Sequence, residues 1–300
     1  MEPGQRTQAV FAPPTMRSRI GRPLAGARRA LRNNPTMTLG FAIMVAAIIM
    51  AIFAPLIATH PHGELAVFDR LSSPSSEHYF GTDSVGRDVF SRAIYGSRLS
   101  LQIGAAVGAI AVFWGAVIGI LAGYYRKFDN IAMRVVDGLM AFPSFLLALA
   151  LVAILGPSLQ NVIIAISLVD TPGVVRIVRS SVLSLKEQMF VEAARAIGAR
   201  PERILIRHVF PQLVAPLLVQ GTFIFAIAIL TEAGLSFLGT GVPPIIPSWG
   251  NMMGESKIYV QLAVWTIFFP GLFISLTVLG MNLIGDGLRD TLDPRLRRTV

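Results

Sequence analysis

Long apolar stretches alternate with shorter charged segments along the whole chain. Six stretches are almost free of charged residues, and each is about as long as a helix needs to be to cross a bilayer, roughly 17–25 residues. The segments between them are polar and rich in Gly, Pro or Arg, which is typical of loops and turns. The pattern therefore predicts an all-α polytopic membrane protein with six transmembrane helices. The predicted spans are residues 36–58, 99–125, 138–155, 159–175, 209–238 and 258–284.

Interruptions are predicted in two of these spans, and two spans contain a carboxylate. Pro143 divides the third span, and the sequence Asp-Thr-Pro-Gly at residues 170–173 predicts an interruption of the fourth. Asp170 and Glu232 lie within spans, where a charge is costly and usually faces a bundle interior or a water-filled path. We expect both residues either to line or gate a translocation path or to form hydrogen bonds between helices.

Glycine and tryptophan positions predict where helices pack and end. The pairs Gly104/Gly108 and Gly115/Gly119 are each four residues apart, so they predict close packing of the second span against another helix. Gly285 and Gly287 predict the end of the last helix. Trp249 is expected to anchor its loop at the membrane interface.

Composition supports the membrane class and indicates an orientation. The chain of 300 residues is 53% hydrophobic and only 14% charged, with a net charge of +9. Of its 26 Lys and Arg residues, all but five lie in segments that six spans place on the side of both termini. An excess of Lys and Arg marks the cytoplasmic face, so both termini are predicted to be cytoplasmic. The positive charge then reflects topology and attraction to anionic lipid, not nucleic-acid binding. The five exceptions are Arg70, Arg87, Arg92, Arg98 and Lys257.

The same pattern divides the chain into four parts. Residues 1–35 form a basic cytoplasmic tail, and residues 36–98 hold the first span and a periplasmic loop. Residues 99–288 form the main transmembrane domain, with a charged loop at 186–211, and residues 289–300 form a second cytoplasmic tail. A cleaved signal peptide is the alternative for the N-terminal part. The first apolar stretch is longer than a signal region of about 7–15 residues and no clear cleavage site follows, which favours an uncleaved span.

The charged loop has the periodicity of a short helix followed by a turn and a second helix. Gly198 stands where a helix would end in a left-handed residue, and Pro201 suits the first turn of the next helix. Apolar residues before the glycine recur at the spacing of one helical face: Phe190, Ala193, Ala194 and Ile197.

A motif runs through this loop. Glu192-Ala193-Ala194 is followed after three residues by Gly198 and, further on, by Pro211. The spacing resembles the cytoplasmic EAA loop of bacterial ABC importer permeases, except that His208 and Phe210 stand where that motif has Ile and Leu. The resemblance implies a coupling helix that sits in a groove of an ATPase subunit. An amphipathic loop lying on the lipid surface is the alternative. The expected coupling residues are Glu192, Ala193, Ala194, Ile197, Gly198, Arg203, Arg207 and Pro211.

The loop before the second span carries a long pattern of turn-forming and charged residues. Asp83 can cap the helix that follows a Gly-Thr-Asp turn, and Arg87 and Asp88 alternate with apolar residues as in a helix at the membrane surface. The motif residues are Gly81, Thr82, Asp83, Gly86, Arg87 and Asp88. The pattern closely resembles the corresponding segment in the dipeptide, oligopeptide and nickel group of these permeases. Three later segments extend the resemblance, at residues 232–239, 243–250 and 282–294. Within that group the chain looks like the second permease subunit.

The resemblance also implies partners, an energy source and a location. A homologous permease would pair with this chain, two ABC ATPase subunits would bind beneath, and a periplasmic or lipid-anchored substrate-binding protein would deliver cargo. The chain has no phosphate-binding loop, so we expect ATP and magnesium in the ATPases and no cofactor on this chain. The location would be the bacterial inner membrane. Di- or oligopeptides are the expected cargo, with nickel complexes, glutathione and opines as alternatives.

A secondary transporter or channel and a membrane enzyme are the two alternative classes of function. A self-sufficient secondary transporter or channel would have ionisable residues across several spans and a repeat-related pair of broken helices, and the sequence shows no such repeat. An enzyme would need a nucleophile, a base or metal ligands in a recognisable arrangement, and no catalytic residues are predicted. His60, His62 and His78 share the outer loop, but their spacing matches no known pattern, so no metal site is predicted.

Overall fold

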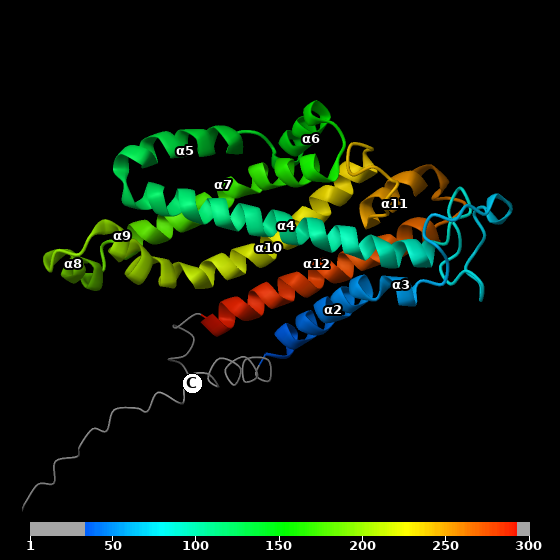
Figure 1. Ribbon diagram of the computed structural model, residues 1–300, viewed down its shortest axis with the longest axis horizontal. Coiled ribbons are helices and arrows are strands. Elements are labelled where there is room, and N and C mark those ends of the chain that lie inside the picture. The colour runs from blue at the N-terminus through cyan, green and yellow to red at the C-terminus, as the bar shows by residue number, and fades with distance from the viewer. Residues whose placement is uncertain (1–33, 293–300) are drawn as a thin grey trace, which may run out of the picture.

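A computed structural model describes residues 34–292 as an elongated bundle of helices without β-strands (Figure 1). The predicted tails lie largely outside the described residues. The α5–α6 pair and the bundle of α2, α4, α7, α10 and α12 extend between two ends. One end carries α8 and α9, and the other carries α11 and the loop before α4. In chain order the elements are α2 (Pro35–Ile52), α3 (Ala54–Ile57), η2 (Val67–Asp69), α4 (Val89–Tyr124), α5 (Arg126–Met140), α6 (Ser144–Leu155), α7 (Leu159–Leu185), α8 (Met189–Ala196), α9 (Pro201–Ile204), η3 (Leu205–Val209), α10 (Phe210–Phe237), α11 (Trp249–Ser256), η4 (Lys257–Tyr259) and α12 (Trp265–Leu292).

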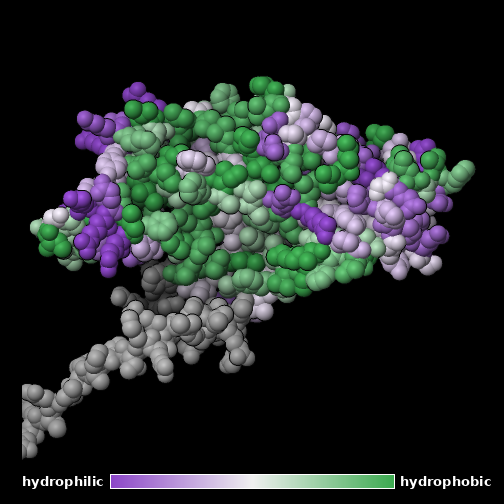
Figure 2. Space-filling model, in the orientation of Figure 1, coloured by the Kyte–Doolittle hydropathy of each residue, from purple (hydrophilic) through white to green (hydrophobic). Residues whose placement is uncertain are grey.

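The helices meet the length and hydropathy expected of membrane spans. Within residues 34–292, five helices are long and apolar enough to cross a bilayer, and the bent pair α5–α6 makes a sixth if it is counted as one span. Figure 2 shows hydrophobic side chains over the middle of this face and hydrophilic ones gathered at both ends. An apolar belt between two polar ends is the surface that a bilayer stabilises, so the all-α membrane class is confirmed.

Glycines on α4 bring it into close contact with two other helices. A Cβ atom at Gly115 would lie 2.4 Å from the Cβ of Val174, and one at Gly119 would lie 2.7 Å from the Cβ of Val178, both on α7. Gly104 of α4 instead faces α10, where a Cβ at this glycine would lie 3.1 Å from the ring of Phe225. The predicted close packing of the second span is therefore confirmed, and it joins α4 to α7 and α10.

The prediction that glycines end the last helix is wrong. Helix α12 continues through Gly285 and Gly287 to Leu292. A Cβ at Gly287 would lie 2.4 Å from the Cβ of Met37, so this glycine lets α12 approach α2 closely. Intrahelical hydrogen bonding continues through both residues because neither adopts a positive φ angle.

The interruptions predicted in the third and fourth spans have different outcomes. Helices α5 and α6 meet at a bend of 89° just before Ser144, as Pro143 suggested. Helix α7 passes through Pro172 without a break, so the predicted interruption there is wrong. A single proline removes one intrahelical donor, and the hydroxyl of Thr171 donates to the carbonyl of Ser167 at 2.6 Å in the same turn.

Candidate functional site

The loop at residues 186–211 forms the helix, turn and second helix that its sequence predicts. Helix α8 ends in a Schellman motif: the amide of Ala199 donates to the carbonyl of Ala194, and that of Gly198 donates to Arg195. Gly198 adopts a φ angle of +79°, which is the left-handed conformation that favours glycine. Pro201 then begins α9.

The buried face of α8 differs from the predicted one. Val191 and Ala194 are buried and belong to the main apolar core, together with Val182 of α7 and Ile204 of α9. Of the expected face, only Ala194 points inward, and Ile197 is 85% exposed. The periodicity predicted a helix correctly. It could not predict which side of the helix meets the bundle, because α8 carries small or large apolar residues on more than one of its sides.

The outward side of the loop carries charges that have no partner within the described part of the chain. Glu192, Arg203 and Arg207 are exposed, and none of them makes an ion pair within residues 34–292. Exposed apolar side chains lie among them, since Met189 is 84% and Ile197 is 85% exposed. The surface combines charge with uncovered apolar area, which is typical of a protein interface.

The second helix of the loop is longer than predicted. Helix α9 continues through the π-helical turn η3 into α10, so a helical segment of 37 residues runs from Pro201 to Phe237. Pro211 is in the first turn of α10, where a proline is tolerated. At the other side of the loop, the amine of Lys186 donates to the carbonyl of Gly123 at the end of α4. The loop is therefore attached to three of the long helices.

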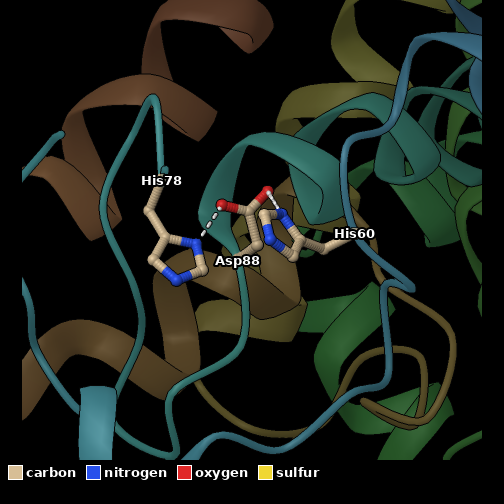
Figure 3. A group of neighbouring side chains, drawn as sticks. All are labelled: His60, His78 and Asp88. Carbon is tan, nitrogen blue, oxygen red and sulfur yellow. Dashed lines mark hydrogen bonds and ion pairs between the residues drawn. The ribbon is translucent and has the colours of Figure 1, made fainter. Parts of the chain in front are cut away.

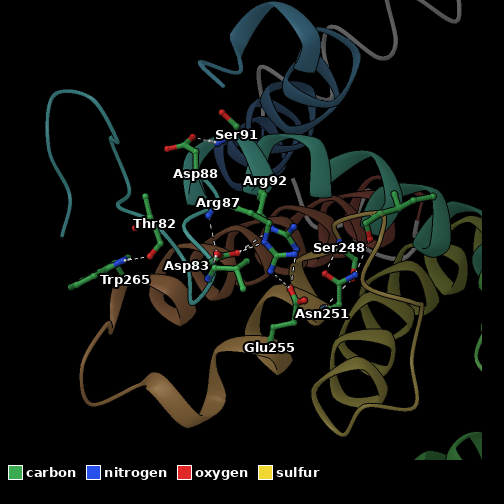
Figure 4. Close-up of polar contacts among 12 residues, drawn as sticks. Thr82, Asp83, Arg87, Asp88, Ser91, Arg92, Ser248, Asn251, Glu255 and Trp265 are labelled. Atoms are coloured by element: carbon green, nitrogen blue, oxygen red, sulfur yellow. Dashed lines mark hydrogen bonds and ion pairs between the residues drawn. The ribbon is translucent and has the colours of Figure 1, made fainter. Parts of the chain in front are cut away.

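The motif at the opposite end forms a buried network of charged groups (Figure 4). One carboxylate oxygen of Asp83 accepts hydrogen bonds from the amides of Val85 and Arg87, both at 2.9 Å. The other oxygen pairs with the guanidinium of Arg87 at 2.5 Å. Arg87 and Arg92 each donate to Glu255 of α11 at 2.9 Å. The network links residues more than 160 positions apart in the sequence, as the Arg92–Glu255 separation of 163 shows.

Sequence reasoning missed two members of this network. Arg92 has only 3% of its side chain exposed, and Glu255 has 30%. Arg92 was expected on a surface helix, but that helix is the first part of α4 and lies inside the protein, so the expectation of a separate surface helix is wrong. A buried arginine needs carboxylate partners, so an acidic residue in another outer segment was the signal that could have found Glu255.

The remaining motif residues shape the backbone of this end. Thr82 is fully buried, and its hydroxyl bonds the backbone of Asp69 and Ser72. Gly86 has a φ angle of +82°, and a Cβ there would lie 1.8 Å from the carbonyl oxygen of Ala66. Gly81, at +71°, likewise leaves no room for a side chain beside Trp265.

The cap of α4 is a different aspartate from the predicted one. Asp88 accepts a hydrogen bond from the amide of Ser91 at 2.7 Å and is the N-cap residue. Asp83 instead closes the preceding turn, so the prediction that Asp83 caps the helix is wrong. Both residues have the right chemistry for a cap, and only the point at which helical φ and ψ begin distinguishes them.

Glu232 lies in the protein interior at the same end. Its side chain is fully buried, and one carboxylate oxygen accepts from Ser236 at 2.7 Å and from Ser248 at 2.9 Å. Ser248 caps α11, so the carboxylate joins α10 to that helix. Trp249 follows; it is completely buried and donates to the carbonyl of Ala93 at 2.9 Å. Its predicted interfacial position is wrong, because its indole packs into the bundle.

Asp170 is the less satisfied of the two carboxylates within spans. It is half-buried on α7, and its Oδ2 atom is buried without a hydrogen-bond partner among residues 34–292. No hydrogen bond joins it to Glu232, so the structure does not bring these two predicted path residues into one cluster. An unpaired buried carboxylate oxygen in a span is costly, which is typical of a group with a role beyond packing.

Comparison with known protein families identifies the family of this chain. The family described as binding-protein-dependent transport system inner membrane component matches residues 115–298. The chain belongs to this family. The N-terminal transmembrane domain of oligopeptide transport permease C matches residues 22–74.

Relatives and a solved structure agree with this membership. The dipeptide transport system permease protein of Alkalihalophilus pseudofirmus is 48% identical, over 92% of this chain and 91% of its own length. A probable peptide ABC transporter permease of Sinorhizobium fredii is 50% identical over 90% and 92%. A glutathione transport system permease of Escherichia coli is 44% identical over 90% and 89%. The MetNI methionine ABC transporter, in an inward-facing conformation, has a similar fold with a TM-score of 0.56 at 18% identity, covering 67% of this chain and 97% of the other.

Proposed function

We propose that this permease conducts di- or oligopeptides, or closely related small solutes, in an ATP-driven importer. The observation that carries the proposal is the loop at residues 186–211, which packs into the main apolar core on its inner side and leaves charged and apolar residues uncovered on its outer side. The names of the relatives, which include dipeptide, peptide and glutathione transporters, support the cargo class.

The proposed assembly contains partners that supply what this chain lacks. Two ABC ATPase subunits bind ATP and magnesium, and one of them receives α8 in a groove. A homologous permease pairs with this chain to enclose the path, and a substrate-binding protein docks at the end that carries α11. This orientation puts both termini and α8 in the cytoplasm of a bacterial inner membrane, as the distribution of Lys and Arg indicates.

The geometry of the loop supports a lever mechanism. Val191 and Ala194 fix α8 to the same core as α7, and the unbroken segment from α9 to α10 extends toward the opposite end. Closure of the ATPases on ATP displaces α8, and this displacement moves α7 and α10 together. The spans then exchange between inward- and outward-facing states, whose populations depend on nucleotide and cargo.

The decisive experiment reverses the charge of Glu192. Glu192→Arg is expected to abolish ATP-dependent uptake in proteoliposomes containing the whole transporter, because the ATPase loses its contact with α8. Gly198→Pro is expected to do the same, since proline cannot adopt a φ angle of +79°. Uptake and ATP hydrolysis are measured side by side.

The matched control is Asp290→Arg, which reverses an exposed acid on α12 outside the loop. Normal uptake by both loop variants would contradict the proposal. Uptake by the purified chain alone, without ATPases, would support a secondary transporter or channel instead.

Asp170 and Glu232 are both expected near a translocation path, but the hydrogen bonds of the fully buried Glu232 join α10 to α11, so Asp170 is the residue proposed to serve the path. Asp170→Asn keeps the shape of the side chain and removes its charge. We expect uptake to fall by at least about tenfold while the complex still assembles, because a charge of this kind within a span normally serves the transport path. Uptake rates and co-purification of the ATPases are the measurements. Unchanged uptake would remove Asp170 from the path.

A further inference from the structure

Three potential metal ligands meet at the outer end of the bundle (Figure 3). His60 follows α3, His78 lies in the loop before α4, and Asp88 is the first residue outside α4. The Nδ1 atom of His78 is 3.0 Å from one carboxylate oxygen of Asp88, and that of His60 is 4.0 Å from the other. One ligand atom from each residue lies within 4.8 Å of the other two.

We propose that these residues bind a divalent transition-metal ion of the zinc class. Zinc takes imidazole nitrogen and carboxylate oxygen at about 2.0–2.2 Å in a tetrahedral arrangement, which separates two ligand atoms by roughly 3.4 Å. The spacings at this site lie on both sides of that value, so small side-chain rotations bring all three ligands onto one ion. The ligand set of two imidazoles and one carboxylate suits zinc, cobalt or nickel better than magnesium or calcium.

The surroundings hold the ligands in place. The side chain of Asp88 is only 1% exposed and is fixed by the amide of Ser91. The hydroxyl of that serine accepts from the amide of His60 at 3.0 Å, so the same residue positions two of the ligands. Supporting hydrogen bonds of this kind orient the ligands of protein metal sites. The ion replaces two existing contacts, those of His78 with Asp88 and of His60 with the hydroxyl of Thr59.

The charge around the site favours a cation. The three ligands line a cavity of about 160 Å³ together with Glu64, Asp69 and Glu77. The one arginine adjacent to Asp88 in the sequence, Arg87, is paired with Asp83 and Glu255 and does not line this cavity. The cavity leaves room for a water molecule as a fourth ligand.

The position of the site gives the ion a structural role. It connects the segment that follows α3 to the N-cap of α4, with His78 from the intervening loop as the third ligand. A metal clip that closes such a loop stabilises the folded state, because binding energy becomes folding energy.

The test uses the assembled transporter, purified through an affinity tag without histidines, stripped with a chelator and dialysed against zinc chloride. Elemental analysis is expected to give one tightly bound zinc per copy of this chain. The double variant H60Q/H78Q should lose this bound zinc ion. Asp88→Asn, which can still cap α4, should weaken the affinity for zinc by at least about tenfold. His62→Gln is the matched control, since His62 belongs to the same loop but not to the cluster, and it should bind zinc like the parent.

Two further readouts separate a metal site from a hydrogen-bonded cluster. Cobalt added to the stripped parent should give the visible absorption of a tetrahedral ion, and the double variant should not. Zinc should raise the thermal unfolding midpoint of the parent and of H62Q but not of H60Q/H78Q, whose midpoint without zinc serves as the check on folding. Equal zinc binding by the parent and the double variant would overturn the proposal, and so would an equal response to magnesium.

Discussion

The two ends of the bundle differ in how their charged residues are satisfied. At the end near α11, Asp83, Arg87 and Arg92 bond to one another and to Glu255, mostly out of contact with solvent. At the α8 end, Glu192 and Arg203 are exposed and make no ion pair within residues 34–292. Both segments carry motifs of similar charge density. The difference indicates that one motif stabilises this chain and that the other is available to a partner.

The largest expected effect comes from breaking the buried network. Arg92→Met leaves Glu255 and Asp83 without one of their partners, and removing one partner of a buried ion pair costs about 3–5 kcal/mol. The matched control is Arg176→Met, because Arg176 pairs with Asp137 at 2.6 Å but 47% of its side chain is exposed. The control should change the free energy of unfolding by only about 0–1 kcal/mol. The measurement is the thermal unfolding midpoint of each variant in lipid nanodiscs, relative to that of the parent. Equal shifts of the midpoint in the two variants would show that the buried ion pairs stabilise the chain no more than the exposed pair does.

A pair of glycines gives the next test. Gly86 and Gly198 have nearly the same backbone conformation, with φ angles of +82° and +79°. A Cβ at Gly86 would collide with Ala66, whereas a Cβ at Gly198 meets nothing within 4 Å. Gly198→Ala should therefore cost only the left-handed strain of about 1–2 kcal/mol, and Gly86→Ala should cost about 2–4 kcal/mol because overpacking adds to it.

The same midpoint measurement ranks the two variants. If Gly198→Ala proves as destabilising as Gly86→Ala, the α8 turn is constrained by contacts that the described chain does not contain.

The smallest effect on stability is expected on the open surface of α8. Ile197→Ser should change the free energy of unfolding of this chain by no more than about 0.5 kcal/mol, because the side chain is 85% exposed. Its effect on ATPase binding should be much larger, about tenfold or more in affinity, if the side chain becomes buried in the partner. Leu65→Ser, at the opposite end and 63% exposed, is the control and should leave ATPase binding unchanged. Equal binding by both variants would show that α8 does not dock through this face.

Much of the architecture could be predicted from the sequence. The six apolar stretches, the bend at Pro143 and the close packing of α4 through Gly115 and Gly119 follow from local composition and spacing. The geometry of the α8 turn was also predictable, because a left-handed residue followed by a helix-starting proline has few alternatives to Gly198 and Pro201.

Several positions were predicted incorrectly because their outcome depends on distant residues. Trp249 looked like an interfacial anchor, yet its indole is buried beside the carbonyl of Ala93. Pro172 looked like a break, yet α7 is continuous, and the turns that follow the proline pack on α4 through Val174 and Val178. Neither outcome can be derived from a local pattern, since both depend on which helix lies alongside.

Hydropathy and the placement of glycine and proline act locally, so they were enough to predict a bundle of membrane helices with a charged helical loop between two of them. Which charged side chains are buried and which are exposed depends on how the helices pack. Arg92 and Glu255, separated by 163 positions, become partners because α4 and α11 pack together. His60, His78 and Asp88 meet because the segment between α3 and α4 folds back on the start of α4. Electrostatic and metal-binding chemistry depends on distances of a few ångströms, and those distances are set by packing between elements that are remote in sequence.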